Sequence, residues 1–265
     1  MIKDPAFWST VIAVVALVLS QLPPVRELLK ARQLRILIPD NLTLQHYMGN
    51  LQLVVFLALR NSGGREVMVQ KVECVITSEE GRHWRLPAQT IVTSPAGGHS
   101  SPELFMGWVS LKPDEQWTQT VRFFKVWSVQ DEEEATGISA RIRTDINTKI
   151  SQRLPEQSNK LAEADPELVQ QAKDFFEKRF SLTKGSYRLL VAASSDGNEL
   201  LCVRGFDFTL FDHQVRALRS AVDDYKIGAG IYYMNNDPSK GGAFIRLRPL
   251  AETEVQAEYA RMLAA

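Results

Sequence analysis

Along most of the chain, apolar and polar residues alternate with a period of two, the pattern of half-buried β-strands. The clearest stretch places Leu51, Val55 and Leu59 on one face, with Leu53 and Leu57 between them. Turn residues at 61–64 follow it. Further strands are predicted at 35–38, 72–76, 117–126 and 138–146, and the acidic run 131–134 is expected to be a solvated loop.

Three segments have helical spacing instead. In the first, Asp165 is a good N-cap, Pro166 suits the first helical position, and the apolar residues of 168–180 recur every three or four positions. The second is predicted at 212–225, with Asp212 as its cap. The third is predicted at 251–263, after a short strand at 244–247. The chain is therefore expected to be mainly β with inserted and C-terminal helices.

The segment after the first helix contains a predicted hairpin. The run Gly185-Ser-Tyr187-Arg-Leu189-Leu-Val191 leads into a turn at 195–198 and returns through Phe206, Phe208 and Leu210. This order resembles the last two strands of an immunoglobulin-like or fibronectin-III-like sandwich, and Tyr187 resembles the tyrosine corner of that fold. The chain lacks the Cys…Trp…Cys spacing of antibody domains.

The resemblance implies one antiparallel β-sandwich rather than two domains. The closing hairpin needs the earlier strands as partners, because an isolated hairpin has little stability of its own. The sandwich would cover 34–211 with a helical insertion near 165–180, and 212–265 would form a helical C-terminal extension.

The N-terminal region, residues 1–33, has a different character. Residues 6–22 carry no charged side chain, and Pro23 and Pro24 follow. About 17 apolar residues are at the lower limit for crossing a bilayer, and Phe7 and Trp8 resemble an interfacial aromatic anchor. We expect a single-pass transmembrane helix. A cleaved signal peptide and a helix packed on or lying along a surface are the alternatives.

Basic residues follow this run at Arg26, Lys30, Arg32 and Arg35. Positive charge beside a membrane span favours the cytoplasmic side, so the body is predicted to be cytoplasmic at the cell membrane. A periplasmic or secreted body is the alternative. The same four side chains are candidates for contact with anionic lipid headgroups.

Composition narrows the possible functions. The 265 residues have a formal net charge of zero and 45% hydrophobic content, which is typical of a globular protein with no electrostatic preference for nucleic acid. Only two cysteines are present, Cys74 and Cys202, too few for a disulfide scaffold. Both fall at core-facing strand positions and are expected to be buried thiols, with a disulfide as the alternative in an oxidising compartment.

No sequence motif indicates catalysis. The histidines His46, His83, His99 and His213 are scattered without a metal-ligand spacing, and no serine lies in a nucleophile elbow. The glycine pairs lack the order of a phosphate-binding loop. No cofactor or metal is expected. An enzyme whose site is assembled from distant residues remains an alternative.

Three aromatic residues at predicted loops or strand ends, Phe105, Trp108 and Trp127, are the candidate partner-binding patch. Their alternative role is to fill the core, where aromatic residues of sandwiches usually lie. With the predicted anchor, they lead to the hypothesis of a membrane-anchored, non-catalytic module that binds or scaffolds another protein. An exported, envelope-facing sandwich that binds a ligand is the competing hypothesis.

Overall fold

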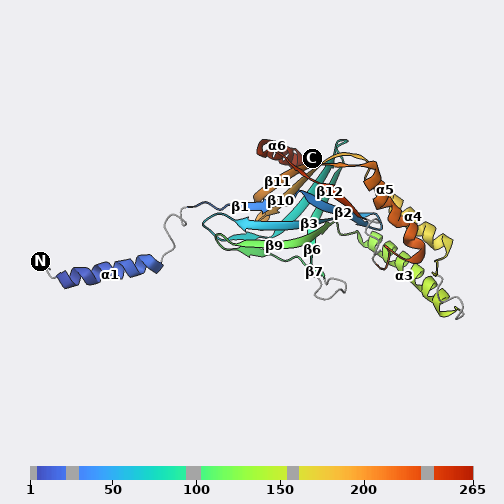
Figure 1. The fold of residues 1–265 in the computed structure, drawn as a ribbon, viewed down its shortest axis with the longest axis horizontal. Helices are drawn as coiled ribbons and strands as arrows, with labels where there is room; N and C mark the ends of the chain where they lie inside the picture. The colour runs from blue at the N-terminus through green and yellow to red at the C-terminus, as the bar shows by residue number, and fades with distance from the viewer. Residues whose placement is uncertain (1–4, 22–29, 94–102, 154–160, 234–241, 265) are drawn as a thin grey trace.

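A computed structural model describes residues 5–21, 30–93, 103–153, 161–233 and 242–264 (Figure 1). The strands are β1 (Leu34–Leu37), β2 (Asn41–Tyr47), β3 (Asn50–Asn61), β4 (Val67–Val69), β5 (Lys71–Ser78), β6 (His83–Val92), β7 (Glu103–Phe105), β8 (Val109–Leu111), β9 (Gln116–Phe124), β10 (Gly185–Ser194), β11 (Leu200–Leu210), β12 (Gly242–Arg246) and β13 (Arg248–Pro249). The α-helices are α1 (Pro5–Gln21), α3 (Val129–Ser151), α4 (Pro166–Arg179), α5 (Asp212–Ser220) and α6 (Glu252–Ala264), and the 3-10 helices are η2 (Asp196–Asn198) and η3 (Ala221–Ile227). The protein is mainly β with several helices.

Eleven of the described strands form one antiparallel sheet with the order β12-β2-β3-β9-β6-β5-β10-β11-β13, in which β1 also pairs with β3 and β7 with β6. Strands β4 and β8 form a separate pair. Strand β11 lies near one end of this order, and it contacts both β12, at the opposite end, and β1. The sheet is therefore nearly closed.

The sheet turns a corner at β6. The first half of this strand pairs with β5, and its second half pairs with β9 after a register shift between Ala88 and Thr90. A bulge at this place lets one strand pass between two packed layers. The strands therefore form one continuous antiparallel sheet that folds over at β6.

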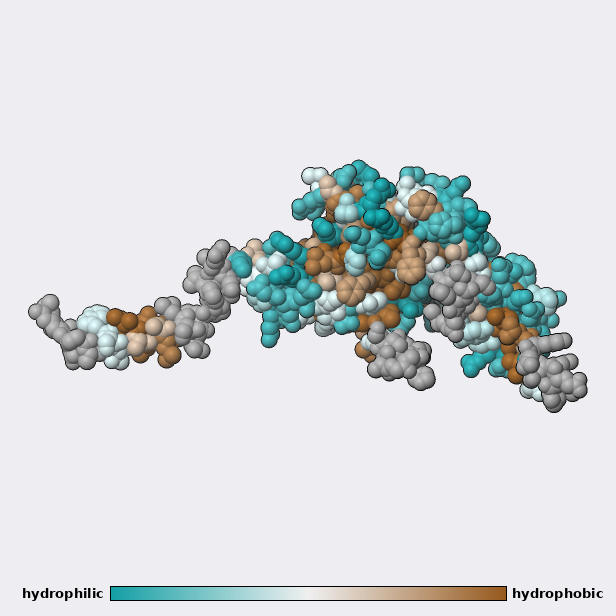
Figure 2. All heavy atoms as spheres, in the orientation of Figure 1, coloured by the Kyte–Doolittle hydropathy of each residue, from teal (hydrophilic) through white to brown (hydrophobic). Residues whose placement is uncertain are grey.

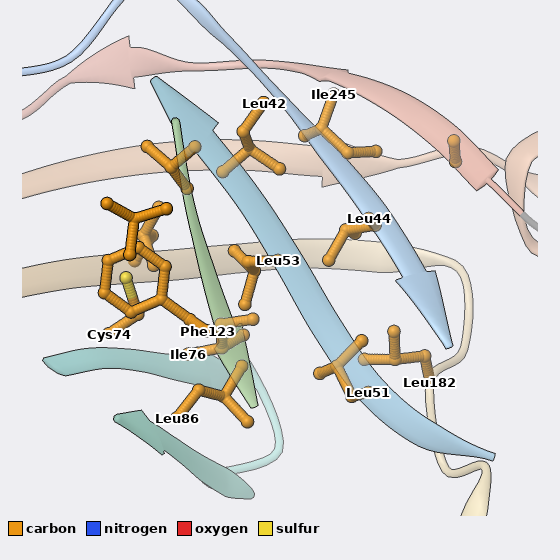
Figure 3. Close-up of a cluster of buried hydrophobic side chains, with 14 of the residues drawn as sticks. Leu42, Leu44, Leu51, Leu53, Cys74, Ile76, Leu86, Phe123, Leu182 and Ile245 are labelled. Carbon is orange, nitrogen blue, oxygen red and sulfur yellow. The ribbon is translucent and has the colours of Figure 1, made fainter. Parts of the chain in front are cut away.

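The core lies between the two halves of the folded sheet. Figure 3 shows side chains from β2, β3, β5, β6, β9 and β12 that point toward one another. The period-two prediction for β3 is confirmed, since all five of its predicted core residues are buried. Cys74 is buried, Cys202 is half-buried, and both are free thiols. Cys74 and Cys202 therefore do not form the disulfide that was the alternative prediction.

The predicted strand at 138–146 and the predicted loop at 131–134 are wrong, because both belong to the helix α3. Ile138, Ile142 and Ile146 are buried, and their spacing of four residues defines one helical face. Ser128 caps the helix by accepting a hydrogen bond from the Asp131 backbone N–H at 3.1 Å. Asp131 and Glu132 of the acidic run lie in the first turn, where negative charge is favourable.

The predicted helix near 165–180 is confirmed as α4, with Asp165 as its N-cap and Pro166 at its start. Helix α5 and the short strand β12 are also where the sequence places them. Helices α3, α4 and α5 lie together at one end of the body (Figure 1). Helix α6 instead packs Val255 against the outer face of the sheet, beside Val75 and Leu190.

Helix α1 lies apart from the body (Figure 1). Its 17 residues reach about 25 Å at 1.5 Å per residue, which is less than the ~30 Å of a hydrocarbon core. Among the described residues, no helix combines the length and the apolar character that a membrane crossing requires. The predicted transmembrane helix is therefore unsupported.

Candidate interaction surfaces

The predicted partner patch divides into an exposed part and a packed part. Phe105 is 89% exposed and Trp108 is 74% exposed, whereas Trp127 is half-buried. The Trp127 ring lies 5.4 Å from the Tyr47 ring and 5.6 Å from the Phe175 ring, between centroids. Trp127 therefore joins the sheet to α4, and only Phe105 and Trp108 are available to a partner.

Sequence reasoning missed a third exposed apolar residue, Leu104, which is 57% exposed. We call Leu104, Phe105 and Trp108 the β7 patch. Strand β7 pairs with β6, which places Phe105 opposite Thr90. Figure 2 shows apolar atoms at the surface of the body where β7 lies. Leu104 and Phe105 leave the strand on opposite faces, and large exposed apolar residues grouped along one segment are a feature of interaction sites.

Polar contacts hold β7 in place. The Glu103 carboxylate accepts a hydrogen bond from the Thr90 hydroxyl at 2.7 Å and pairs with the Arg122 guanidinium at 2.8 Å. Because Glu103 and Phe105 are two residues apart, their side chains leave the strand on the same face. The ion pair thus fixes the strand that presents the Phe105 ring to solvent.

The basic flank is exposed where the structure describes it. Lys30, Arg32 and Arg35 are all exposed, and Arg26 lies outside the described residues. Leu34 and Ile36, which alternate with Arg35, are buried in the core of the sheet. The described basic side chains are therefore exposed to solvent at the start of β1 and in the residues just before it.

A cavity of about 840 Å³ lies between the sheet and the helices α3 and α4. We call it the junction cavity. Four chain segments line it: the β2–β3 turn, the start of β6, the residues after β9 and the end of α4. Its apolar lining includes Trp84, Trp127 and Phe180, and its cationic lining includes Lys125 and Arg179.

Arg179 is held firmly at the edge of this cavity. Its guanidinium lies 3.4 Å from the centre of the Phe175 ring, donates to the Phe175 carbonyl at 3.1 Å, and pairs with Asp131 and Glu134. The hydrogen bond from Arg179 is the main cause that lowers the pKa of the Asp131 carboxyl. Asp131 is therefore ionised and partnered at neutral pH.

The β2–β3 turn fits tightly under α4. Met48 and Gly49 both have positive φ, at 46° and 90°, as a tight turn between two antiparallel strands requires. A Cβ atom at Gly49 would lie 2.8 Å from the Phe176 carbonyl oxygen. Glycine is needed here both for the backbone conformation and for the close approach of the helix.

His46, in β2, is half-buried beneath α4 and α5. Its Nε2 lies 2.8 Å from the Leu218 carbonyl, and its Nδ1 accepts a hydrogen bond from the Gly49 backbone N–H at 3.3 Å. A carbonyl only accepts and an N–H only donates, so the ring is neutral with its proton on Nε2. Burial lowers the pKa of His46 to about 4, helped by the nearby positive charge of Arg219.

A second cavity, of about 640 Å³, lies between α6 and strands β5, β10 and β11. Glu258, nearly buried, accepts hydrogen bonds from Arg188 at 2.7 Å and from Arg261 at 3.0 Å. His83 and Asp207 also line this cavity. The Asp207 carboxylate lies 3.6 Å from Arg188, so the acidic groups are partnered by arginines.

The described histidines lie on different elements. His46 lies under the helices, His83 on β6 and His213 on α5, while His99 lies outside the described residues. In the described ranges, no histidine forms a hydrogen bond with a carboxylate, and no group of His, Cys, Asp and Glu could hold a metal ion. His83 Nδ1 is 3.0 Å from the hydroxyl of Thr77, its neighbour across the β5–β6 pair.

No known family model matches this sequence, and a search of curated proteins gives no match.

Proposed function

We propose that this protein is a membrane-tethered, non-catalytic module, in which α1 holds the body at a bilayer and the β7 patch binds another protein. The observation that carries the proposal is the exposure of Phe105, on a strand that the Glu103–Arg122 ion pair holds in place, together with the exposure of Trp108 three residues later. Two further supports are the apolar surface of α1 and the basic residues that follow it.

The tether is argued from the distribution of apolar residues around α1. Its described large apolar side chains, which include Ile12, Val14 and Leu17, are exposed and spread over more than half of the circumference of the helix, and the remaining face carries Ser9, Ala13 and Ala16. A protein groove covers one face of a helix, whereas a helix that is apolar all round needs an environment that covers all of it. Lipid provides such an environment, and a bilayer adjusts to a short helix at modest cost.

The ends of α1 give the proposed tether its direction. Phe7 and Trp8 lie at one end, as aromatic residues do at a membrane interface. Lys30, Arg32 and Arg35 follow the other end. By the positive-inside tendency, this charge supports a body on the cytoplasmic side, close to anionic lipid headgroups.

A charge in the middle of α1 tests the tether. We expect Val14→Asp to reduce binding of the full-length protein to vesicles of phosphatidylcholine and phosphatidylserine at least tenfold, because a carboxylate is costly in hydrocarbon. Flotation of the vesicles measures the bound fraction. Val129→Asp is the matched control, since Val129 is 82% exposed at the start of α3. Equal flotation of the two variants would contradict the tether.

The β7 patch has the features of a binding hot spot. Tryptophan and other aromatic residues are enriched in protein interfaces, where they bury much area at little entropic cost. Phe105 belongs to an edge strand with an apolar surface, which is a place that proteins normally protect. A protein partner that covers the patch would remove this exposed apolar surface from water.

We expect the double variant Phe105→Ser and Trp108→Ser to lose at least tenfold in affinity for the partner while its stability stays unchanged. The loss follows because truncated interface aromatics commonly cost 2 kcal/mol or more. Co-purification from detergent-solubilised membranes identifies the partner, and titration of purified components measures the affinity. Phe244→Ser is the matched control, because Phe244 is 76% exposed on another edge strand, β12. A partner retained equally by all three proteins would contradict the proposed role of the patch.

An immunoglobulin-like origin of the body is part of the same proposal. Its support is the β10–β11 hairpin and the hydroxyl of Tyr187, which donates a hydrogen bond to the Thr183 carbonyl at 2.7 Å. A tyrosine that bonds to the backbone a few residues upstream is the tyrosine-corner arrangement. The continuous sheet that folds over at β6 distinguishes this body from a sandwich of two separate sheets.

A further inference from the structure

We propose that one end of the sheet is a contact surface for anionic lipid headgroups, centred on Arg35 and Arg60. The inference rests on the tether proposed above and deepens it, because it assigns the surface of the body that lies against the bilayer. Arg35, in β1, and Arg60, in β3, are directly opposite each other in the β1–β3 ladder. Both side chains are exposed, and residues opposed in this way leave the sheet on the same face.

Two like charges opposite each other in a sheet are unfavourable unless an anion compensates them. The Cβ atoms of directly opposed residues are about 5 Å apart, so two cations there repel each other. In the described part of the chain, neither Arg35 nor Arg60 forms an ion pair or a side-chain hydrogen bond. The neighbour of Arg60 on its other side, in β9, is the uncharged Gln116. A phosphate or carboxylate that contacts both guanidinium groups would remove the repulsion.

The turn after β3 brings two more arginines to the same end of the sheet. The Ser62 backbone N–H donates to the Gln33 carbonyl at 2.8 Å. Gly63 approaches the same segment so closely that a Cβ atom would overlap its backbone. Arg32 and Arg65 lie in these two touching segments, and both are exposed. The backbone therefore fixes the segments that carry the four arginines relative to one another.

The charge of this end stays positive when its acidic residues are counted. The three segments that meet here, 30–37, 58–66 and 112–116, hold six basic and three acidic side chains. Within the described ranges, none of the three acidic side chains pairs with an arginine. Figure 2 shows hydrophilic atoms over the end of the body where β1 begins. The acidic residues are Glu66, Asp114 and Glu115.

The tether favours a bilayer over other anionic partners. Residues 22–33 join the end of α1 to the start of β1, and a chain of this length spans at most about 45 Å. With α1 in the bilayer, the arginine pair is always within reach of the lipid surface, so the effective concentration of headgroups is high. Leu37 is 46% exposed on the same face as Arg35. Basic side chains with an apolar neighbour are suited to an anionic membrane surface.

The test measures lipid contact of the body while α1 stays in the membrane. A photoreactive phenylalanine derivative replaces Leu37 in the full-length protein and, in a separate protein, Phe211, which is 55% exposed at the start of α5. Both are reconstituted into phosphatidylcholine vesicles with or without phosphatidylserine, and lipid adducts are measured by mass spectrometry. We expect phosphatidylserine to increase the adduct at position 37 at least fivefold and to cause no such increase at position 211.

Charge substitutions separate lipid recognition from the stability of the sheet. We expect Arg35→Glu to lower the adduct at position 37 at least threefold and to leave the protein at least as stable, because a glutamate opposite Arg60 forms a cross-strand ion pair. Arg35→Glu with Arg60→Glu should lower the adduct to its level in phosphatidylcholine alone. Arg82→Glu with Arg216→Glu is the matched control, since both arginines are exposed on other elements and the change in net charge is the same.

Flotation of the vesicles distinguishes this inference from the tether. If the wild-type protein did not float, the tether and the inference that rests on it would both be contradicted. If it floated, but the adduct at position 37 did not depend on phosphatidylserine or was equal in the double variant and its control, only the inference would be overturned. Crosslinks from position 37 to protein instead of lipid in intact membranes would overturn it as well.

Discussion

Replacement of Trp127 by alanine is expected to destabilise the protein by about 3 kcal/mol, whereas Trp108→Ala should change its stability by less than about 0.5 kcal/mol. Trp127 packs against the rings of Tyr47 and Phe175, so its truncation opens a gap between β2 and α4. Trp108 is 74% exposed and buries little. Urea unfolding at pH 7, with midpoint and slope compared, measures both differences.

Trp127→Phe is the control for this prediction. A phenylalanine keeps an aromatic ring between Tyr47 and Phe175 and should recover most of the stability that alanine loses. If Trp108→Ala destabilised the protein as strongly as Trp127→Ala, Trp108 would be part of the packed body. The division of the three predicted patch residues into exposed and packed would then be wrong.

The second large effect is a loss of stability in acid through His46. We expect the free energy of unfolding to fall by about 3 kcal/mol between pH 6.5 and pH 4 from this residue alone, since each unit of pKa shift corresponds to about 1.4 kcal/mol. The pKa of His46 is about 4 in the folded protein, against an ordinary value of 6.5. Between these values the unfolded chain binds a proton that the folded chain does not bind.

The direction of this effect follows from the surroundings of the ring. Protonation would place a second N–H on Nδ1, where the Gly49 N–H already points, and would leave a charge buried beside Phe176 and Phe180. Stability is therefore constant above pH 6.5 and falls as the pH drops toward 4. Asp131 stabilises the folded protein through its ion pair with Arg179. Because the pKa of Asp131 is lowered, this stabilisation is lost only at more acidic pH.

Urea unfolding at a series of pH values measures the effect. His46→Gln should be less stable at pH 7, because it loses the fitted ring, and its stability should change much less between pH 6.5 and pH 4. His213→Gln is the matched control, because His213 is exposed on α5. An unaltered pH dependence in His46→Gln would show that another group carries the acid sensitivity.

The sequence predicts much of the sheet because its strands have one buried face. Leu51 to Leu57 in β3 alternate with more exposed residues, as a half-buried strand must. In β10, Tyr187, Leu189 and Val191 are buried on the core face, and Leu190 on the other face is buried by α6. Helix α4 is predicted by its cap at Asp165 and by its apolar face. These elements carry their signals in local residue spacing.

Helix α3 was mispredicted because its pattern fits two periods. Ile138, Ile142 and Ile146 are four residues apart, which satisfies both every second position of a strand and one face of a helix. Ala140 and Thr144 completed the alternation in the sequence, yet both are exposed in the structure. The cap at Ser128, followed by acidic residues, is the signal that would have decided for the helix.

The interaction surfaces were predicted only in part, for a related reason. The exposure of Phe105 and Trp108 is consistent with their place near loops, but the packing of Trp127 depends on α4, almost forty residues later in the chain. The junction cavity combines four segments that are far apart in the sequence. No local pattern connects Trp84, Lys125 and Arg179, so only the folded chain brings them together.

The measurement that most directly tests the proposed interaction role is photo-crosslinking from position 105 in intact membranes. A photoreactive phenylalanine derivative is placed at Phe105 and, in a separate protein, at Phe244. Both positions are exposed aromatics on edge strands. We expect one discrete crosslinked protein from position 105 that is absent from position 244. The same products from both positions, or none from position 105, would contradict a partner-binding role for the β7 patch.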